Sequence, residues 1–282
     1  MQHAASAIIA PDTERPPVYW QFYDAVARAQ LRQWLPTGRH VLVDVSGPRV
    51  PVADLAAQAG HTVIRVVDAG LGQGAPAAIS HDGPGQVLLV QADSSRLSFL
   101  ADGCADGVLA EDRALSVHLA AETMVAEIAR VLRPAGRVFA CVDSLVLGMA
   151  VLADQHHWAQ LIDLPHAEVV LVPWPDGTIT RCFGPDQARE LFAGAGLRVN
   201  WIRSRTVLAE SVVTHWLRRD PGGLPKLLRA ELAARSDGSL GAQLVISASK
   251  PRWFPPQGGP GGSGGAGSPP RSGGVLGGRP PG

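Results

Sequence analysis

The chain of 282 residues is poor in the residues that build disulfide scaffolds, metal centres or basic binding surfaces. Its 3 cysteines are far apart and form no Cys-x-x-Cys pair. We therefore expect no disulfide framework and no metal site, and we interpret Cys104, Cys141 and Cys182 as small buried apolar residues. The 25 basic residues are balanced by 25 acidic residues. Without a global positive field to attract phosphates, we expect no nucleic-acid partner.

Long apolar runs are also missing. No stretch approaches the roughly 20 consecutive apolar residues that a membrane-spanning helix needs. The first residues lack the basic and apolar segments of a secretory signal. The hydrophobic fraction of 46% and the charged fraction of 18% are typical of a globular protein. We therefore expect no membrane partner and a reducing, cytoplasmic location.

The composition along the chain predicts one folded unit with a loose segment at each end. Residues 254–282 are mostly Gly and Pro with some Ser, so they cannot bury enough apolar surface to offset the entropy of ordering them. We expect a disordered tail there, and a flexible N-terminus over residues 1–17. The folded domain is predicted over residues 18–253, with no internal repeat or linker.

Strand-like and helix-like segments alternate along this domain. Strands are predicted at residues 40–45, 62–67, 86–91, 106–110, 137–142, 197–204 and 242–248. Helices are predicted at residues 18–35, 52–59, 119–132, 145–161, 185–195 and 224–234. Segments 168–172 and 178–182 flank the turn Pro175-Asp176-Gly177 and predict a hairpin. The alternation predicts an α/β fold, a Rossmann-like doubly wound sheet that is mostly parallel and has helices on both faces.

A carboxylate stands at or just after the end of each of the first four predicted strands. These residues are Asp44, Asp68, Asp93 and Glu111, and Asp112 follows the last of them. A single such acid can simply cap the next helix. Together they predict a ligand rich in hydroxyl and amino groups, because the carboxyl ends of parallel strands form the binding edge of an open sheet. An acid after the second strand can accept hydrogen bonds from a ribose.

Three runs of sequence resemble the class I S-adenosylmethionine-dependent methyltransferases, in particular the methyltransferase type 11-like group. They are EIARVLRPAGRVFACVDS at 127–144, ADSSRLSFLADGCADGVLAEDRALSVHL at 92–119, and FGPDQARELFAGAGLRV at 183–199. The resemblance implies a sheet of about seven strands whose last strand is antiparallel. It also implies S-adenosyl-L-methionine as the cofactor and methyl transfer to an acceptor, which we expect to be a small molecule.

The same resemblance implies roles for the acids at the strand ends. Asp68 would bind the ribose hydroxyls of the cofactor. Asp93, together with Ala92, would contact the adenine. Glu111 would lie near the cofactor at the end of the fourth strand.

The loop after the first strand would hold the methionine part of the cofactor through Asp44, Ser46 and Gly47. In the family this loop reads D-x-G-x-G-x-G, whereas here Ser46, Pro48 and Val50 stand at the three glycine positions. Glycine lets the backbone approach a ligand closely, and proline has no N–H to donate. This departure favours an alternative hypothesis, a catalytically inactive methyltransferase-like protein that acts in binding or regulation.

Two other features of the sequence, a glycine-rich run and several histidines, give weaker indications of function. The run Gly70-Leu71-Gly72-Gln73-Gly74 imitates a dinucleotide-binding fingerprint and is the basis of a third hypothesis, an NAD-dependent oxidoreductase. No helix pattern follows that run, so we interpret it as a flexible loop. His118 and His156 are candidates for a general base, and the adjacent His156 and His157 cannot form an i, i+4 metal pair. The sequence assigns no catalytic residue and leaves the acceptor and the oligomeric state open.

Overall fold

The computed structural model describes residues 17–68, 83–164, 167–174, 176–234 and 240–252. They belong to one compact unit, Met1–Arg252. The expected tail at 254–282, the glycine run at 70–74 and most of the expected flexible N-terminus lie outside the described residues. Pro17, the last residue of that N-terminal segment, begins the first described helix.

The described residues form a twisted sheet of nine strands. The strands are β1 (Val41–Asp44), β2 (Thr62–Val67), β3 (Gln86–Gln91), β4 (Ala105–Ala110), β5 (Leu132–Ser144), β6 (Val170–Pro173), β7 (Ile179–Phe183), β8 (Arg198–Arg205) and β9 (Gln243–Ser249). Strands β3, β2, β1, β4 and β5 are neighbours in that order and parallel. Strand β9 runs antiparallel between β5 and β8. This confirms the predicted mostly parallel α/β sheet with an antiparallel last strand.

The predicted hairpin of β6 and β7 adds the two strands beyond the expected seven. Its strands are antiparallel, and β7 pairs with the last residues of β5 through Asp143 and Ser144. The hairpin therefore stands at the carboxyl end of the parallel strands. That is the edge at which open α/β sheets bind ligands.

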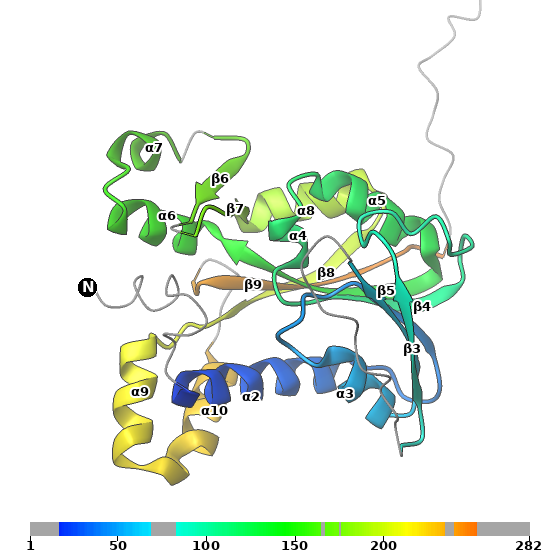
Figure 1. The fold of residues 1–282 in the computed structure, drawn as a ribbon, viewed down its shortest axis with the longest axis horizontal. Helices are drawn as coiled ribbons and strands as arrows, with labels where there is room; N and C mark the ends of the chain where they lie inside the picture. The colour runs from blue at the N-terminus through cyan, green and yellow to red at the C-terminus, as the bar shows by residue number, and fades with distance from the viewer. Residues whose placement is uncertain (1–16, 69–82, 165–166, 175, 235–239, 253–282) are drawn as a thin grey trace, which may run out of the picture. The chain divides into compact units, whose positions relative to one another are not determined.

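Helices cover both faces of the sheet (Figure 1). One face carries α2 (Pro17–Trp34), α3 (Val52–Gln58), α9 (Glu210–Arg219) and α10 (Leu224–Ala233), and the other carries α4 (Ala114–Val117), α5 (Ala121–Val131) and α8 (Pro185–Gly194). Two more helices, α6 (Leu145–Asp154) and α7 (Trp158–Asp163), follow β5. Alternate residues of β4 enter the two cores, with Val108 in one and Leu109 in the other, as the two-residue period of a strand requires.

Helix α2, predicted from the sequence at residues 18–35, packs on the sheet through one apolar face. Tyr23, Ala27, Leu31 and Trp34 are buried there. The indole N–H of Trp34 donates to Ser247 Oγ of β9, 3.0 Å away, so this buried polar group is satisfied. The N-terminal turns of α2 extend toward the carboxyl ends of the strands, where their aromatic side chains line a cavity.

Several sequence expectations were wrong in detail. The helix expected at 145–161 is two helices, because His156 has a left-handed backbone (φ 58°) that an α-helix cannot contain. The helix expected at 119–132 begins at Ala121, and β5 starts at Leu132. Helix α9 was not predicted, since its buried face includes Glu210 and Thr214. Cys104, expected to be buried, is exposed in the turn before β4.

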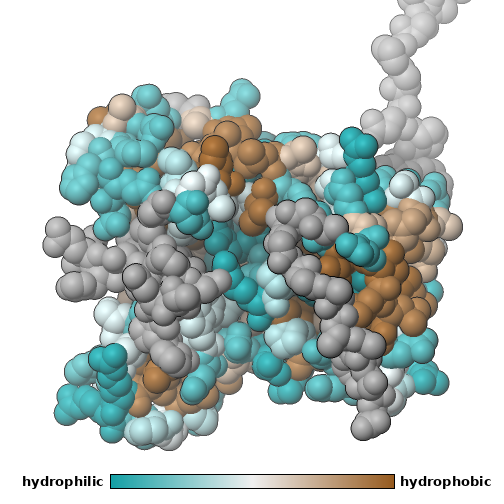
Figure 2. Space-filling model, in the orientation of Figure 1, coloured by the Kyte–Doolittle hydropathy of each residue, from teal (hydrophilic) through white to brown (hydrophobic). Residues whose placement is uncertain are grey.

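No helix among the described residues is both long enough and apolar enough to cross a membrane. Some hydrophobic side chains are exposed in groups on the surface of the protein. In the view of Figure 2 the largest apolar area lies over β3, where Leu88 is 47% exposed.

Candidate functional site

A cavity of about 350 Å³ lies at the carboxyl ends of β1, β2 and β4. Its volume falls within the range of small-molecule pockets, roughly 300–1,000 Å³. Three of the residues predicted to bind the cofactor, Ser46, Gly47 and Asp68, are part of its wall. Strand β1 delivers the first two, and β2 delivers Asp68, because both strands are parallel and end at the same edge.

The loop that follows β1 already uses its backbone donors within the protein. Each N–H from Val45 to Arg49 donates to a protein acceptor, except at Pro48, which has none. The donor–acceptor distances are 2.9 Å from Val45 N to Leu109 O, 2.9 Å from Ser46 N to Asp44 Oδ1, 3.1 Å from Gly47 N to Glu111 O, and 3.0 Å from Arg49 N to Asp112 Oδ2. The loop therefore offers a ligand its side chains and carbonyl groups rather than its N–H groups.

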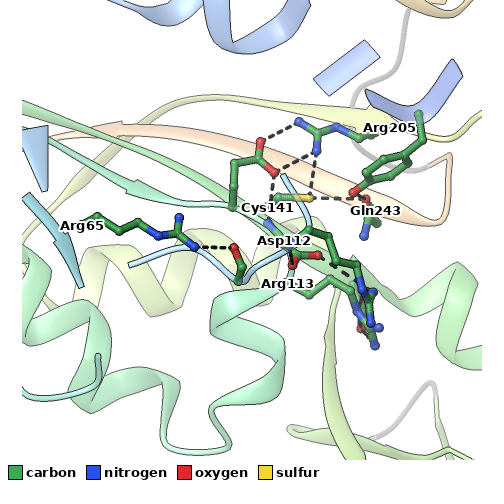
Figure 3. A network of polar contacts seen from close by, with 11 residues as sticks. Arg65, Asp112, Arg113, Cys141, Arg205 and Gln243 are labelled. Atoms are coloured by element: carbon green, nitrogen blue, oxygen red, sulfur yellow. Dashed lines mark hydrogen bonds and ion pairs between the residues drawn. The ribbon is translucent and has the colours of Figure 1, made fainter. Parts of the chain in front are cut away.

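Asp44 holds this loop from inside the protein rather than facing the cavity. Its carboxylate is fully buried and is bound by the Arg65 guanidinium of β2 (Figure 3). A second nitrogen of Arg65 donates to Gly47 O, 3.0 Å away. Arg65 was not singled out in the sequence, although an arginine inside the apolar strand TVIRVV is a usable signal of a buried charge partner.

Glu111, expected near the cofactor at the end of the fourth strand, lines neither cavity and is turned into the interior. Its two oxygens accept hydrogen bonds from Arg205 at 2.7 and 2.9 Å, and both side chains are completely buried (Figure 3). Arg205 Nε also donates to Gln30 Oε1, 2.7 Å away. Burial alone would lower the pKa of Arg205, but the charges of Glu111 and its other neighbours together raise it well above its ordinary value. Arg205 of β8 therefore joins Glu111, at the end of β4, to Gln30 of α2.

The next two residues, Asp112 and Arg113, form a strained turn at the cavity wall. Both have left-handed backbones, with φ 54° and 63°, which non-glycine residues adopt at a cost. The turn sits tightly against Gly47, where a Cβ would lie 2.3 Å from Asp112 Oδ2. Burial raises the pKa of the Asp112 carboxyl above its ordinary value. Glycine at position 47 is thus required by the approach of Asp112 and its backbone.

Arg113 is held on two sides. Its Nε lies 2.9 Å from each oxygen of the fully buried Asp143, and Nη2 lies 2.8 Å from Asp143 Oδ2. Its guanidinium carbon lies 4.6 Å from the centre of the Trp174 ring, a cation–π contact. Arg113 therefore connects the end of β4 with the end of β5 and with the hairpin.

A second, smaller cavity of about 30 Å³ adjoins the first. Tyr19, Trp20 and Tyr23 of α2 form one side of it. The Tyr23 hydroxyl donates to Gln243 Oε1 of β9, 2.8 Å away, and burial raises the pKa of Tyr23 well above its ordinary value. All three lie in the helix predicted at residues 18–35, but nothing in the sequence indicated that they line a cavity.

The two cavities share three charged residues of their walls, Arg49, Asp112 and Arg113. Arg49 Nη1 lies 3.9 Å from Asp112 Oδ1, and the Arg49 side chain is 37% exposed whereas that of Asp112 is 6% exposed. A ligand in the larger cavity would thus meet a ligand in the smaller one across this charged boundary.

Ala92 and Asp93, expected to contact adenine, lie outside both cavities, and the neighbouring Ser94 lines the larger one. Asp93 Oδ1 accepts hydrogen bonds from the hydroxyl and the N–H of Ser95, which lower the pKa of Asp93. Ser94 Oγ lies 2.9 Å from His118 Nε2, and His118 is also part of the larger cavity's wall.

The remaining histidines singled out in the sequence lie elsewhere. His156 and His157 are exposed at the break between α6 and α7 and line neither cavity. Within the part of the chain that the structure describes, no group of three or more His, Cys, Asp or Glu side chains is placed to hold a metal ion.

Comparison with known proteins gave one family match and a set of structures with the same fold. Residues 26–140 match the family model described as "Methyltransferase domain". An S-adenosylmethionine-dependent methyltransferase structure from Listeria monocytogenes shares the fold at 14% identity and a TM-score of 0.53, covering 80% of this chain and 98% of that chain. One from Mesorhizobium loti does so at 15% identity and a TM-score of 0.51, covering 81% and 100%.

A third structure, a methyltransferase from Methanosarcina mazei, has 14% identity and a TM-score of 0.51, covering 79% of this chain and 97% of that chain. Identities this low show the fold and say nothing of the substrate. A search of curated proteins found no match.

Proposed function

We propose that this protein transfers a methyl group from S-adenosylmethionine to a small-molecule acceptor, because residues 26–140 match the family model described as "Methyltransferase domain" and the fold is shared with S-adenosylmethionine-dependent methyltransferases. The unit proposed to carry this function spans residues 18–253. The observation that carries the proposal is the pair of adjoining cavities at the carboxyl edge of the sheet. One is large enough for a cofactor, and both meet at Asp112 and Arg113.

The larger cavity fits the adenosyl part of the cofactor by its volume and by its lining. Asp68 stands after β2, where a carboxylate accepts hydrogen bonds from ribose hydroxyls in related folds. Ser94 and His118 offer further polar groups on the same wall. We assign the adenine to this side of the cavity, next to Ala92 and Asp93.

The methionine part of the cofactor needs partners other than backbone donors, because those of the loop at 45–49 are engaged. The Arg49 guanidinium is partly exposed and lines the cavity beside this loop. A carboxylate pairs well with a guanidinium. We therefore assign the cofactor's carboxylate to Arg49, with Ser46 and Gly47 as the neighbouring loop surface.

The smaller cavity is assigned to the reacting group of the acceptor. Its aromatic side suits a flat or apolar acceptor, and Asp112 faces both cavities. The acceptor's lone pair would form the bond to the methyl carbon as the bond from that carbon to sulfur breaks. Asp112 would take the proton that the acceptor loses, since its raised pKa suits a general base. The protein otherwise aligns the reactants and excludes water.

Calorimetric titration with S-adenosylmethionine and S-adenosylhomocysteine tests the cofactor assignment. We expect saturable binding of both, and Asp68→Asn should weaken it by about tenfold, because a charge-assisted hydrogen bond contributes about 1.5 kcal/mol or more. Asp186→Asn is the matched control, since that exposed carboxylate at the start of α8 pairs with Arg189 and lines neither cavity. No heat with either nucleoside at millimolar concentration would refute the proposal.

A second function, binding or regulation without catalysis, is favoured by the same loop. Pro48 and the engaged N–H groups remove donors that a cofactor could use. The smaller cavity also holds only a few atoms in this structure. Turnover of labelled methyl groups onto any acceptor would exclude this second function, whereas cofactor binding without turnover on a broad acceptor panel would favour it.

A further inference from the structure

Helix α7 presents apolar side chains to the surface. Trp158 and Ile162 have the i, i+4 spacing of one helix face, and Leu161 between them packs inward against the apolar cluster of α6 and the hairpin. None of the residues of α7 is buried, and Trp158 and Ile162 are 54% and 72% exposed. Met149 of the preceding helix α6 is also exposed. An amphipathic helix whose apolar residues are this exposed is typical of an interaction surface.

Helix α9 has a second apolar stripe. Its inner face carries Val213 and Leu217, which pack into the cluster around α2. Its outer face carries Val212 and Trp216, which are 43% and 57% exposed at i, i+4 spacing. Arg219 lies on this outer face one turn beyond Trp216. Tryptophan and arginine together are the side chains most often found at the energetic centres of protein interfaces.

The two surfaces carry opposite charge. Exposed acidic residues accompany α7, and exposed basic residues accompany α9 and α10. The acidic residues are Asp154, Asp163 and Glu168, and the basic residues are Arg218, Arg219 and Arg229. The structure shows no ion pair between any of them and another described residue. Each surface therefore complements the other in charge as well as in its tryptophan-centred apolar stripe.

The two helices cannot meet within one copy. Strands β5 and β8 are both antiparallel to β9 and so run in the same direction, which places α6–α7 and α9 after the same edge of the sheet. The helices nevertheless lie on opposite sides of the sheet, as Figure 1 shows. The surface that complements α7 is therefore available from a second copy of the chain.

We propose that the protein forms a symmetric dimer in which α9 of each copy docks on α7 of the other. Two complementary surfaces at the same edge permit this reciprocal contact, and a two-fold axis closes the assembly. Each contact then occurs twice, so a single substitution changes both.

Sedimentation velocity and light scattering on the full chain test the dimer. The wild-type chain should be a dimer, and Ile162→Asp or Trp216→Asp should weaken it by roughly thirtyfold or more, as expected for a residue at the centre of an interface. The control is Leu88→Asp, which places the same charge in the apolar area over β3. Far-UV circular dichroism and thermal melting show whether each variant remains folded.

A charge-exchange series tests which surfaces meet. Asp163→Arg and Arg219→Asp alone should each weaken the dimer by about tenfold, because like charges then face each other. The double variant D163R/R219D should dimerise again. An equimolar mixture of the two single variants should also form heterodimers, since both contacts then pair opposite charges.

The proposal is overturned if the wild-type chain remains a monomer at about 100 µM, because weaker association does not indicate a specific interface. It is also overturned if Leu88→Asp dissociates the dimer while Ile162→Asp and Trp216→Asp do not. Assembly that grows without limit as concentration rises would show a head-to-tail contact instead of the closed dimer. Failure of the mixed single variants to associate would equally reject the reciprocal pairing.

Discussion

Substitution of Arg49 is the sharpest test of the proposed contact between this side chain and the carboxylate of the cofactor. Replacing Arg49 by Met removes the charge and keeps most of the volume. The guanidinium is 37% exposed, so its attraction to a ligand carboxylate is screened by water. We therefore expect a loss of about 1 kcal/mol, below the value for a buried charge-assisted hydrogen bond, which corresponds to roughly a fivefold higher Kd.

Two ligands separate this role from general damage to the site. S-adenosylhomocysteine has the amino-acid carboxylate, whereas 5′-methylthioadenosine keeps the adenosyl group and lacks that carboxylate. Calorimetry should show weaker binding of the first ligand to Arg49→Met and unchanged binding of the second. Asp68→Asn, by contrast, should weaken both ligands, because both contain the ribose.

Two results would refute the reasoning about Arg49. An equal loss for both ligands would mean that the substitution deforms the cavity rather than removing a carboxylate partner. Unchanged binding of S-adenosylhomocysteine would mean that another group holds its carboxylate. Arg49→Lys, which keeps the charge without the planar fork, should bind with intermediate affinity.

Three further predictions concern the framework behind the site. Gly47→Ala should destabilise the fold by about 1–3 kcal/mol in urea titrations, because the new Cβ would overlap Asp112; a neutral effect would show that this turn adjusts freely. Arg205→Met should lower the free energy of unfolding by about 3–5 kcal/mol, because it leaves Glu111 buried without its partner. Adding Glu111→Leu should recover most of that stability. A double variant as unstable as Arg205→Met alone would contradict this account. Asp112→Asn should increase the free energy of unfolding at neutral pH, because burial raises the pKa of this carboxyl and so disfavours its ionised form in the folded state. The stability gained by the substitution should shrink as the pH falls toward 3.8, the ordinary pKa, where the carboxyl is protonated in both states. A stability gain that grows as the pH falls would contradict this account.

Local patterns were sufficient for most of the fold. The strands at 62–67 and 86–91 match the structure residue for residue, because both are short apolar runs between clear breaks. The hairpin around residue 176 was likewise readable from its turn residues. Helix α9 was missed because its buried face contains Glu210 and Thr214 beside apolar residues. The hydrophobic periodicity that marks an amphipathic helix is therefore hard to recognise in its sequence.

The candidate site was readable only in part. Acids at the strand ends pointed to the edge of the sheet at which the larger cavity lies, and Asp68 is part of the wall of that cavity. The inward orientation of Asp44 and Glu111 was missed. Arg65, which binds Asp44, lies in the apolar run of the neighbouring strand β2 and was overlooked, whereas Arg205, which binds Glu111, lies 94 residues away on β8. The sequence also did not show that aromatic residues of α2 line a second cavity.

The sequence by itself determined the order of the strands, the mostly parallel sheet and the edge at which the acidic residues stand. These follow from the spacing of apolar residues and turn residues, which acts over a few positions at a time. Only the tertiary structure decided which carboxylates face the cavity and which are neutralised in the interior. That choice depends on where the arginines of other strands lie in the fold, since a charge is costly to bury unless an opposite charge pairs with it.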